Sequence, residues 1–209
     1  MNKTQSTAAQ PILHDEQILV VKRSLLFKDN AAFNGLSTEN TEEYLDIIKK
    51  NQEFLPRTLM EQSPEYKQII PYLIFRHQDT YFAMQRKASA SEQRLKNKFT
   101  LGIGGHVRQE DMLNSSSIFD LAHREFYEEV NYADTFTITT LGLINDDSNE
   151  VGKVHIGLAL LVEGNSNAIT IRSELKQGTL ISLDNCVSSY DRMESWSQII
   201  IDHLKSHTF

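Results

Sequence analysis

Three glutamates, Glu125, Glu128 and Glu129, follow Arg124 at spacings that bring them together on one face of a helix. Positions i, i+3 and i+4 are neighbours on a helical surface, so these carboxylates would repel one another. A divalent cation such as Mg²⁺ takes oxygen ligands and would relieve that repulsion. Such a cluster taken alone is more often a solvated helix face, so its surroundings have to decide between the two interpretations.

A glycine-rich turn, residues 102–106 (GIGGH), lies upstream of the acidic segment. Phe99 to Ile103 has the composition of a short strand that runs into this turn. Gly104 and Gly105 could belong to an ordinary tight turn, but a strand, a glycine turn and an acidic helix in succession favour a functional site. His106 is expected to pack or to form local hydrogen bonds and not to catalyse.

The helix that carries the glutamates is expected to begin at a cap in Ser115–Ser117 and to run to about Val130. Its apolar residues recur at helical spacing and would form the buried face: Ile118, Phe119, Ala122, Phe126 and Val130. The glutamates lie outside this stripe.

The rest of the chain predicts a mixed set of strands and helices. Asn40 is expected to cap a helix over Glu42–Asn51 and Asp191 a final helix, while the stretch around Phe54–Arg57 looks irregular. Pro71 suits the start or the edge of its strand. Strands are expected over Ile18–Arg23, Gln68–Phe75, Tyr81–Arg86, Phe136–Ile144, Val154–Val162, Ala168–Ile171 and Thr179–Leu183, with a hairpin between the second and the third.

The composition describes a packed globular chain of 209 residues with 40% hydrophobic residues and a net charge of −7. This charge disfavours nucleic acid as a partner but permits a small phosphorylated substrate if a cation lies between the negative groups. Apolar stretches such as Ile156–Val162 are too short to span a bilayer, so no membrane partner is expected. Cys186 is the only cysteine, which excludes an internal disulfide and fits a cytoplasmic location.

The acidic segment and the glycine turn together resemble the Nudix hydrolases, a MutT-like superfamily. That family carries a box of the form G-x5-E-x7-R-E-U-x-E-E-x-G-U, where U is bulky and apolar. Here the second half is residues 124–132 (REFYEEVNY), and the region Phe99–Tyr132 covers about a sixth of the chain. Residues 67–72, 92–95 and 102–106 are also similar to a bacterial subgroup of predicted phosphoesterases.

The resemblance implies an α/β (α+β) fold, in which helices and a mixed sheet form an α/β/α sandwich. Residues 61–209 would be the Nudix domain. Residues 1–60 would be an N-terminal extension that packs on it and shapes either specificity or a homodimer interface. Apart from the resemblance, residues 88–97 are polar and could act as a mobile lid over the site.

Two features depart from the family's box. Gly105 and Arg124 are separated by the eighteen residues 106–123, whereas the pattern has thirteen, so about five residues are inserted. The family's first glutamate therefore has no clear counterpart: counting from the left gives Asp111, and counting from the right gives Ser116. Asn131 stands where the family has glycine, and it is expected to end the helix in a left-handed conformation.

The resemblance also implies roles for individual residues. Glu125, Glu128 and Glu129 would bind Mg²⁺, or Mn²⁺, and a carboxylate would accept the proton of the attacking water. Arg124 would orient the glutamates by charge-assisted hydrogen bonds. Further metal ligands would be the Gly104 carbonyl and Glu174, with Glu150 and Glu163 as rivals for the latter. Apart from the resemblance, Arg86 ends a strand just before the site, so it could contact a phosphate or form a surface salt bridge. Gly105 is the other expected substrate contact.

The resulting hypothesis is metal-dependent hydrolysis of the pyrophosphate bond of a nucleoside diphosphate linked to another moiety. One alternative is a catalytically weak Nudix-like domain that senses a nucleotide. Such domains commonly lose box glutamates, and all three remain here. A second alternative, an isopentenyl diphosphate isomerase, needs a cysteine near the glycine turn, where this chain has His106. No motif identifies which nucleotide derivative would be bound.

Overall fold

A computed structural model describes residues 15–27, 32–86, 98–113, 115, 117–172 and 175–207 of the chain. The strands are β1 (Gln17–Lys22), β2 (Gly35–Ser37), β3 (Glu53–Pro56), β4 (Tyr66–His77), β5 (Thr80–Arg86), β6 (Phe99–Thr100), β7 (Gly102–Ile103), β8 (Val130–Asn131), β9 (Phe136–Asn145), β10 (His155–Gly164), β11 (Thr170–Ile171) and β12 (Leu175–Ser182). The α-helices are α1 (Arg23–Leu26), α2 (Thr41–Asn51), α3 (Arg57–Met60), α4 (Ile118–Glu129), α5 (Glu150–Val154), α6 (Leu183–Ser188) and α7 (Ser195–His207). Within these ranges, no helix has both the length and the apolar character needed to cross a lipid bilayer.

The main sheet has its strands in the order β12-β5-β4-β10-β9-β2, and it is mixed. β4 and β10 run parallel at its centre, with His155 to Glu163 paired with Gln68 to Arg76. The other neighbouring strands along this path pair antiparallel. β4 and β5 form the expected hairpin, and its turn contains Gln78 with a φ of 51°.

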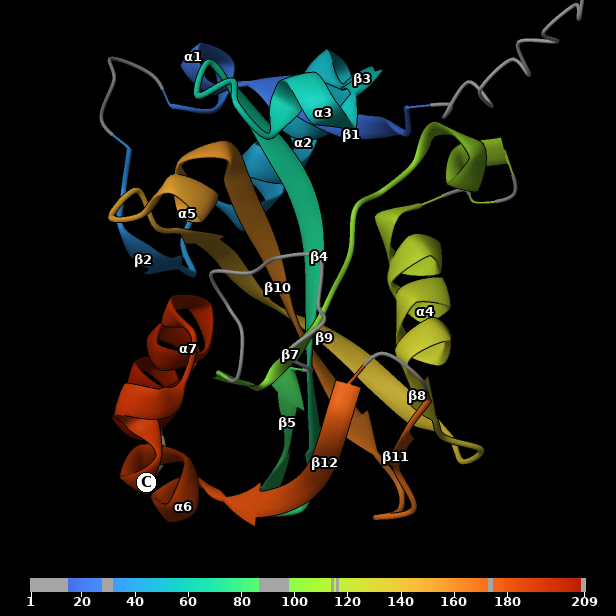
Figure 1. Ribbon diagram of the computed structural model, residues 1–209, viewed down its shortest axis with the longest axis vertical. Coiled ribbons are helices and arrows are strands. Elements are labelled where there is room, and N and C mark those ends of the chain that lie inside the picture. Colours follow the sequence, from blue (N-terminus) through green and yellow to red (C-terminus); the bar gives the residue numbers. More distant parts are fainter. Residues whose placement is uncertain are drawn as a thin grey trace, which may run out of the picture.

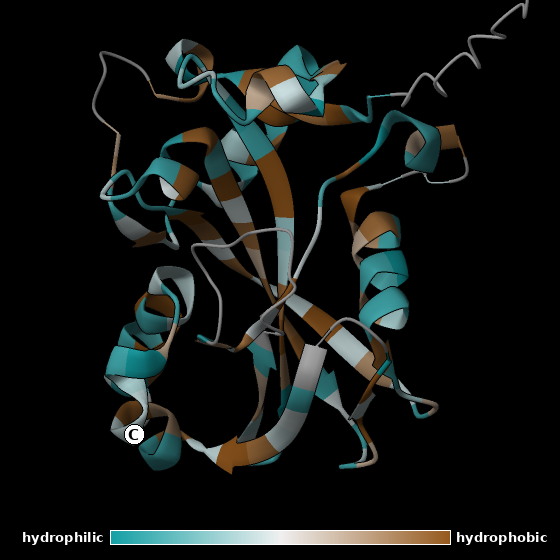
Figure 2. Ribbon diagram, viewed as in Figure 1, coloured by the Kyte–Doolittle hydropathy of each residue, from teal (hydrophilic) through white to brown (hydrophobic). Residues whose placement is uncertain are grey.

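Helices cover both faces of this sheet, and side-chain alternation explains how (Figure 1). Successive residues of a strand point to opposite faces. Leu73 and Phe75 therefore belong to the core under α4, whereas Tyr72 and Ile74 belong to the core under α7. Figure 2 shows the same division, since the outward sides of α4 and α7 are largely hydrophilic. The fold is thus the expected α/β/α sandwich.

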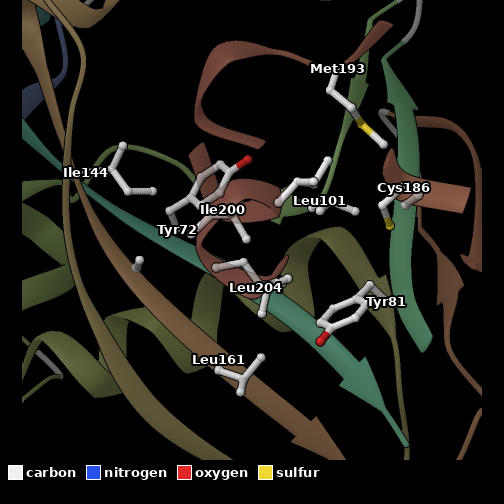
Figure 3. Packing of buried hydrophobic residues seen from close by; sticks show 13 residues of the cluster. Tyr72, Tyr81, Leu101, Ile144, Leu161, Cys186, Met193, Ile200 and Leu204 are labelled. Atoms are coloured by element: carbon white, nitrogen blue, oxygen red, sulfur yellow. The ribbon is translucent and has the colours of Figure 1, made fainter. Parts of the chain in front are cut away.

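The core under α7 is drawn in Figure 3, where Tyr72, Leu161 and Leu204 bring together side chains from β4, β10 and α7. Tyr72 also packs edge-on against Trp196, with 5.4 Å between the ring centroids. This contact places the start of α7 beside the middle of β4, where Ile70 and Tyr72 line the site described below.

The segment before residue 61 joins the sheet by hydrogen bonds. β1 pairs with β3 on one side and with residues Tyr66–Gln68 of β4 on the other, while β2 pairs with β9. Ile18 and Val20 of β1 are fully buried and pack with Met60. We continue to propose that residues 1–60 are an extension of a domain formed by residues 61–209.

Several local expectations were wrong, and for residues 53–56 the reason is their pairing with β1. Residues 53–56 form β3 and are not irregular. Asn40 precedes α2 in a left-handed conformation, and its side chain makes no capping hydrogen bond. α7 begins at Ser195, four residues beyond Asp191, and Asp191 instead lies in the 3₁₀ helix Tyr190–Arg192.

Asn131 does not end α4 in a left-handed conformation. The helix passes directly into the extended strand β8, in which Asn131 pairs with Thr170 of β11. Its side-chain oxygen accepts a hydrogen bond from Arg172 Nε at 3.0 Å. A strand needs no positive φ, so glycine is not required at this position.

Pro71 lies in the middle of β4 and not at its start or edge. On the side away from β10, β1 pairs with residues 66–68 and β7 with Leu73 and Ile74. Among the described strands, none pairs with Pro71 on that side, so the missing N–H of proline interrupts no ladder there. The glycine turn passes this gap, and a Cβ added to Gly104 would lie 2.4 Å from the Pro71 carbonyl oxygen.

Candidate active site

α4 has a well-defined start that places its glutamates. Ser117 caps the helix: its hydroxyl accepts a hydrogen bond from the Asp120 amide, and its own amide donates one to the Asp120 carboxylate. Such a capping box satisfies amide groups that would otherwise lack partners. Ala122 and Phe126 are fully buried against the sheet, so the acidic face of the helix is turned toward the glycine turn.

Gly105 fits closely against Glu125. A Cβ added to Gly105 would lie 2.5 Å from Glu125 Oε2, closer than side-chain carbons approach other atoms. The glycine therefore gives the carboxylate access to the backbone of the turn. Gly104 is equally constrained, by Pro71. The two glycines join the turn and the acidic helix into one site.

Glu125 is buried, with 7% of its surface exposed. Its burial raises the pKa of the carboxyl to about 7, with Arg124 opposing this rise and Glu128 and Glu129 adding to it. Glu128 is exposed and Glu129 is half-buried. The three glutamates thus share one face of α4 in three different environments.

Arg124 contacts two of these glutamates and a third carboxylate. Its Nη2 lies 2.6 Å from Glu125 Oε1, and its Nη1 lies 2.7 Å from Glu128 Oε1. Nη2 also donates to Asp111 Oδ2 at 2.8 Å. These contacts are the ones expected of a residue that orients the glutamates.

Asp111 lies within the inserted segment and is one of the two candidates for the family's first glutamate. Residues Gln109–Leu113 form a 3₁₀ helix, and the Asp111 side chain is buried. Its Oδ2 accepts hydrogen bonds from the Arg108 amide at 2.9 Å and from Arg124. Ser116, the other counterpart considered for the family's first glutamate, lies outside the described residues. Within the part of the chain that the structure describes, Asp111 therefore links the inserted segment to Arg124 of the Nudix box.

A cavity of about 470 Å³ opens beside the acidic face of α4. The glutamates Glu125, Glu128 and Glu129 line it, together with Gly104, Gly105 and Arg124. Its other walls come from elements that lie far away in the sequence, and they include Arg57, Glu61, Arg108, Asn149, His155 and Trp196. The predicted residues therefore share one cavity with groups that local patterns had not indicated.

Two histidines and a glutamate form a second polar cluster in this cavity. Nε2 of His106 lies 3.3 Å from Nε2 of His155 and 3.8 Å from Oε1 of Glu61. Burial, together with smaller effects of the charges of Arg57 and His155, lowers the pKa of His106 to about 3. Burial also lowers the pKa of His155. As expected, His106 makes local hydrogen bonds. His155 was missed, although it is the one polar residue at the start of an apolar strand.

The remaining predicted residues lie elsewhere. Glu174 and residues 88–97 fall outside the described residues. Arg86 ends β5, and its side chain is not described. Glu150 is exposed and pairs with Lys153 at 2.6 Å, and Glu163 pairs with Arg76. Neither Glu150 nor Glu163 lines the described cavity.

A mixed sheet between helices, with a glycine turn against an acidic helix face, is the arrangement of the Nudix fold. The chain is 36% identical over 202 residues to protein YmaB of Bacillus subtilis. This match covers 91% of the chain and 98% of YmaB. Tm1382, a proposed Nudix hydrolase with a known crystal structure, is 29% identical in sequence to this chain. The two structures superpose with a TM-score of 0.77 over 92% of this chain and 100% of Tm1382. No protein-family model matches the chain.

A more distant structure has the same fold. The NUDIX domain of Shewanella oneidensis NrtR, solved with ADP ribose, has a TM-score of 0.53 at 12% identity, and the match covers 67% of this chain and 87% of that domain. The chain therefore belongs to the Nudix hydrolases, a family of pyrophosphohydrolases, and to the same family as YmaB. The narrower resemblance to the phosphoesterase subgroup stays a prediction.

Proposed function

We propose that the protein hydrolyses the pyrophosphate bond of a nucleoside diphosphate linked to another moiety, and that it needs Mg²⁺ or Mn²⁺ to do so. The observation that supports this proposal most directly is the fit of Glu125 against Gly105, in a cavity that Glu128 and Glu129 also line. A solvated acidic face would not require a buried carboxylate at the wall of a cavity.

The donor set fits a hard divalent cation. Three carboxylates and the backbone carbonyl of the turn are oxygen ligands, which Mg²⁺ prefers. Glu125, Glu128 and Glu129 would hold the cation, with the Gly104 carbonyl and Glu174 as further ligands. When bound, the cation would neutralise the charge of the diphosphate and acidify the attacking water.

The chain's own residues then have separable tasks. Arg124 holds Glu125 and Glu128 in place through its two terminal nitrogens. Asp111 contacts Arg124 at the same Nη2 that contacts Glu125. A carboxylate of the triad accepts the proton of the water that attacks phosphorus, and the leaving phosphate departs with its negative charge. We propose Arg86 and the amide of Gly105 as phosphate contacts.

The cavity suits a small ligand. Its volume of about 470 Å³ falls within the range of small-molecule sites, roughly 300–1,000 Å³. The NrtR NUDIX domain was crystallised with ADP ribose, so a domain of this fold holds a nucleotide derivative. This supports a nucleotide derivative as the substrate class for the present chain. The lone cysteine supports the cytoplasm as its location, which cell fractionation would test.

A release screen tests the proposed function. Purified protein is incubated with nucleoside triphosphates, ADP-ribose, dinucleoside polyphosphates, nucleotide sugars, NADH or coenzyme A, in Mg²⁺, Mn²⁺ or EDTA. We expect cleavage of one class that EDTA abolishes and that the Glu129→Gln variant lacks. Silence across the panel, together with thermal stabilisation by a nucleotide, would instead identify a nucleotide-sensing domain.

A further inference from the structure

The cluster of Glu61, His106 and His155 has the make-up of a cation site that is separate from the glutamates of α4. Its three donors come from three places in the chain: the turn after α3, the glycine turn and the first residue of β10. Their ligand atoms all lie within 4.8 Å of one another. His155 is buried and the other two are half-buried, so the cluster forms part of the cavity wall.

Hydrogen bonding fixes the tautomer of His155. Its Nδ1 lies 2.7 Å from the backbone carbonyl oxygen of Val151, which can only accept. Nδ1 therefore carries the hydrogen, and the neutral ring has its lone pair on Nε2. That lone pair belongs to the nitrogen that faces His106. A backbone carbonyl that orients the other ring nitrogen is the usual support of a metal-binding histidine.

His106 is held by Gln68, which is fully buried. The Gln68 amide nitrogen donates to the Met60 carbonyl at 3.2 Å, so its Oε1 faces His106 Nε2, at 2.6 Å. Without a cation, His106 Nε2–H donates to this oxygen. With a cation on Nε2, the ring would carry its proton on Nδ1 with no net proton released, and the Gln68 oxygen, no longer an acceptor, would lie beside the cation.

Two of the donor spacings are close to those of a small tetrahedral site. Zn–N bonds of about 2.0–2.1 Å place neighbouring ligands of a tetrahedron about 3.4 Å apart. The two distances from His106 Nε2, 3.3 Å to His155 and 3.8 Å to Glu61, lie close to that value. Arg57 Nε lies 3.5 Å from Glu61 Oε1 and keeps this carboxylate beside the cluster.

We propose that Glu61, His106 and His155 bind a divalent transition-metal ion of the Zn²⁺ or Co²⁺ type at a second site in the cavity. Two imidazoles and one carboxylate suit such ions better than Mg²⁺, which prefers oxygen alone. Three protein ligands leave a fourth position open, as in catalytic and not in structural zinc sites. The site goes beyond the proposed hydrolysis, because it needs neither the α4 glutamates nor a substrate.

Co²⁺ binding tests this proposal without any measurement of activity. Tag-free full-length protein is titrated with Co²⁺ in excess Mg²⁺, and visible absorption is recorded. We expect a strong band that saturates at about one equivalent and disappears on addition of Zn²⁺. His106→Gln and His155→Gln should abolish the band, and Glu61→Gln should weaken the affinity by roughly tenfold or more.

Two controls separate this site from other cation sites. His203 and His207 form a second histidine pair on α7, with ring centroids 4.1 Å apart, and His207→Gln should leave the band unchanged. Glu129→Gln should also leave it unchanged, whatever that variant does to hydrolysis. A band that persists in both His106→Gln and His155→Gln, or that disappears in His207→Gln, would overturn the proposal.

One further measurement needs no substitution, which matters because His155 is buried and its replacement could unfold the chain. X-ray absorption at the zinc edge of the wild-type protein loaded with one equivalent should show two imidazole ligands. A shell of oxygen alone would place the ion at the glutamates, and no retained zinc would mean that the two histidines only share a hydrogen bond. Either result would overturn the proposal, and neither would contradict hydrolysis by the glutamates.

Discussion

Asp111 and Arg124 are joined across the inserted segment by a hydrogen bond of 2.8 Å between Oδ2 and Nη2. Only 5% of the Asp111 side chain is exposed, and the same carboxylate also bonds Arg108. Arg124 in turn contacts Glu125 and Glu128. A residue of the insertion therefore supports the arginine that orients the glutamates of the box.

Replacing Asp111 with Ala should destabilise the protein and lower its activity. Removing this buried carboxylate takes one partner from each of two guanidinium groups and from the Arg108 amide, which costs about 1–3 kcal/mol. The free energy of unfolding in urea measures the loss. Glu110→Ala is the matched control, because its side chain is 70% exposed and contacts Arg108 at the surface. Equal effects of the two substitutions would mean that the Asp111 contact has no special role.

Replacing Glu129 with Gln should abolish most hydrolysis and leave the fold intact. Glutamine keeps the size of the side chain but removes the charge that a cation or a water proton requires, a loss of about 10²-fold or more in kcat. Steady-state rates with the substrate from the release screen measure the loss, and thermal melting checks the fold. A collapse of the melting temperature would instead identify Glu129 as a structural residue.

Replacing Gly105 with Ala should displace the Glu125 carboxylate, because the new Cβ would lie 2.5 Å from Oε2. We expect weaker Mn²⁺ binding and about 1–3 kcal/mol of lost stability. A double-mutant cycle with Glu125→Ala separates this clash from a backbone effect. In the Glu125→Ala background, Gly105→Ala should cost much less, and an undiminished cost there would show that the glycine serves only the turn.

The raised pKa of Glu125 makes the stability of the metal-free protein depend on pH. Its ordinary pKa is 4.5 and its folded value is about 7, so the folded state holds the proton more tightly than the unfolded state. The resulting stabilisation is complete below pH 4.5 and is lost as the pH rises through 7.

The Glu125→Gln variant should not lose stability as the pH rises through 7, because glutamine does not titrate. Relative to wild type in EDTA, the variant should gain up to about 3 kcal/mol between pH 4.5 and 8, as 2.5 pKa units imply. Urea unfolding at several pH values measures the difference, with Glu110→Gln as the exposed control. Parallel curves for wild type and Glu125→Gln would contradict the raised pKa.

Replacing Glu174 with Gln should raise the Mg²⁺ concentration needed for half-maximal rate, if Glu174 is the fourth acidic ligand. Glu150→Gln is the control, since Glu150 is exposed, pairs with Lys153 and does not line the cavity. Rates measured over a Mg²⁺ titration compare the two. An unchanged titration in Glu174→Gln would exclude Glu174 as a ligand.

The sequence by itself determined the features that depend on local spacing. The i, i+3, i+4 repeat places the three glutamates on one face of α4, and the serine cap sets where that helix begins. The polar turn between two apolar runs produces the β4–β5 hairpin. Neighbours along a helix or across a tight turn are set by backbone geometry alone, so their relation can be deduced from residue types.

Only the tertiary structure decided which distant residues meet in the cavity. His106 and His155 are 49 positions apart, and their contact depends on where β10 begins beside β4 and on the path of the glycine turn past Pro71. Asn131 became extended because β11 pairs with it, which no property of Asn131 indicates. Strand register and loop path are set by the packing of the whole chain, and residue spacing does not encode them.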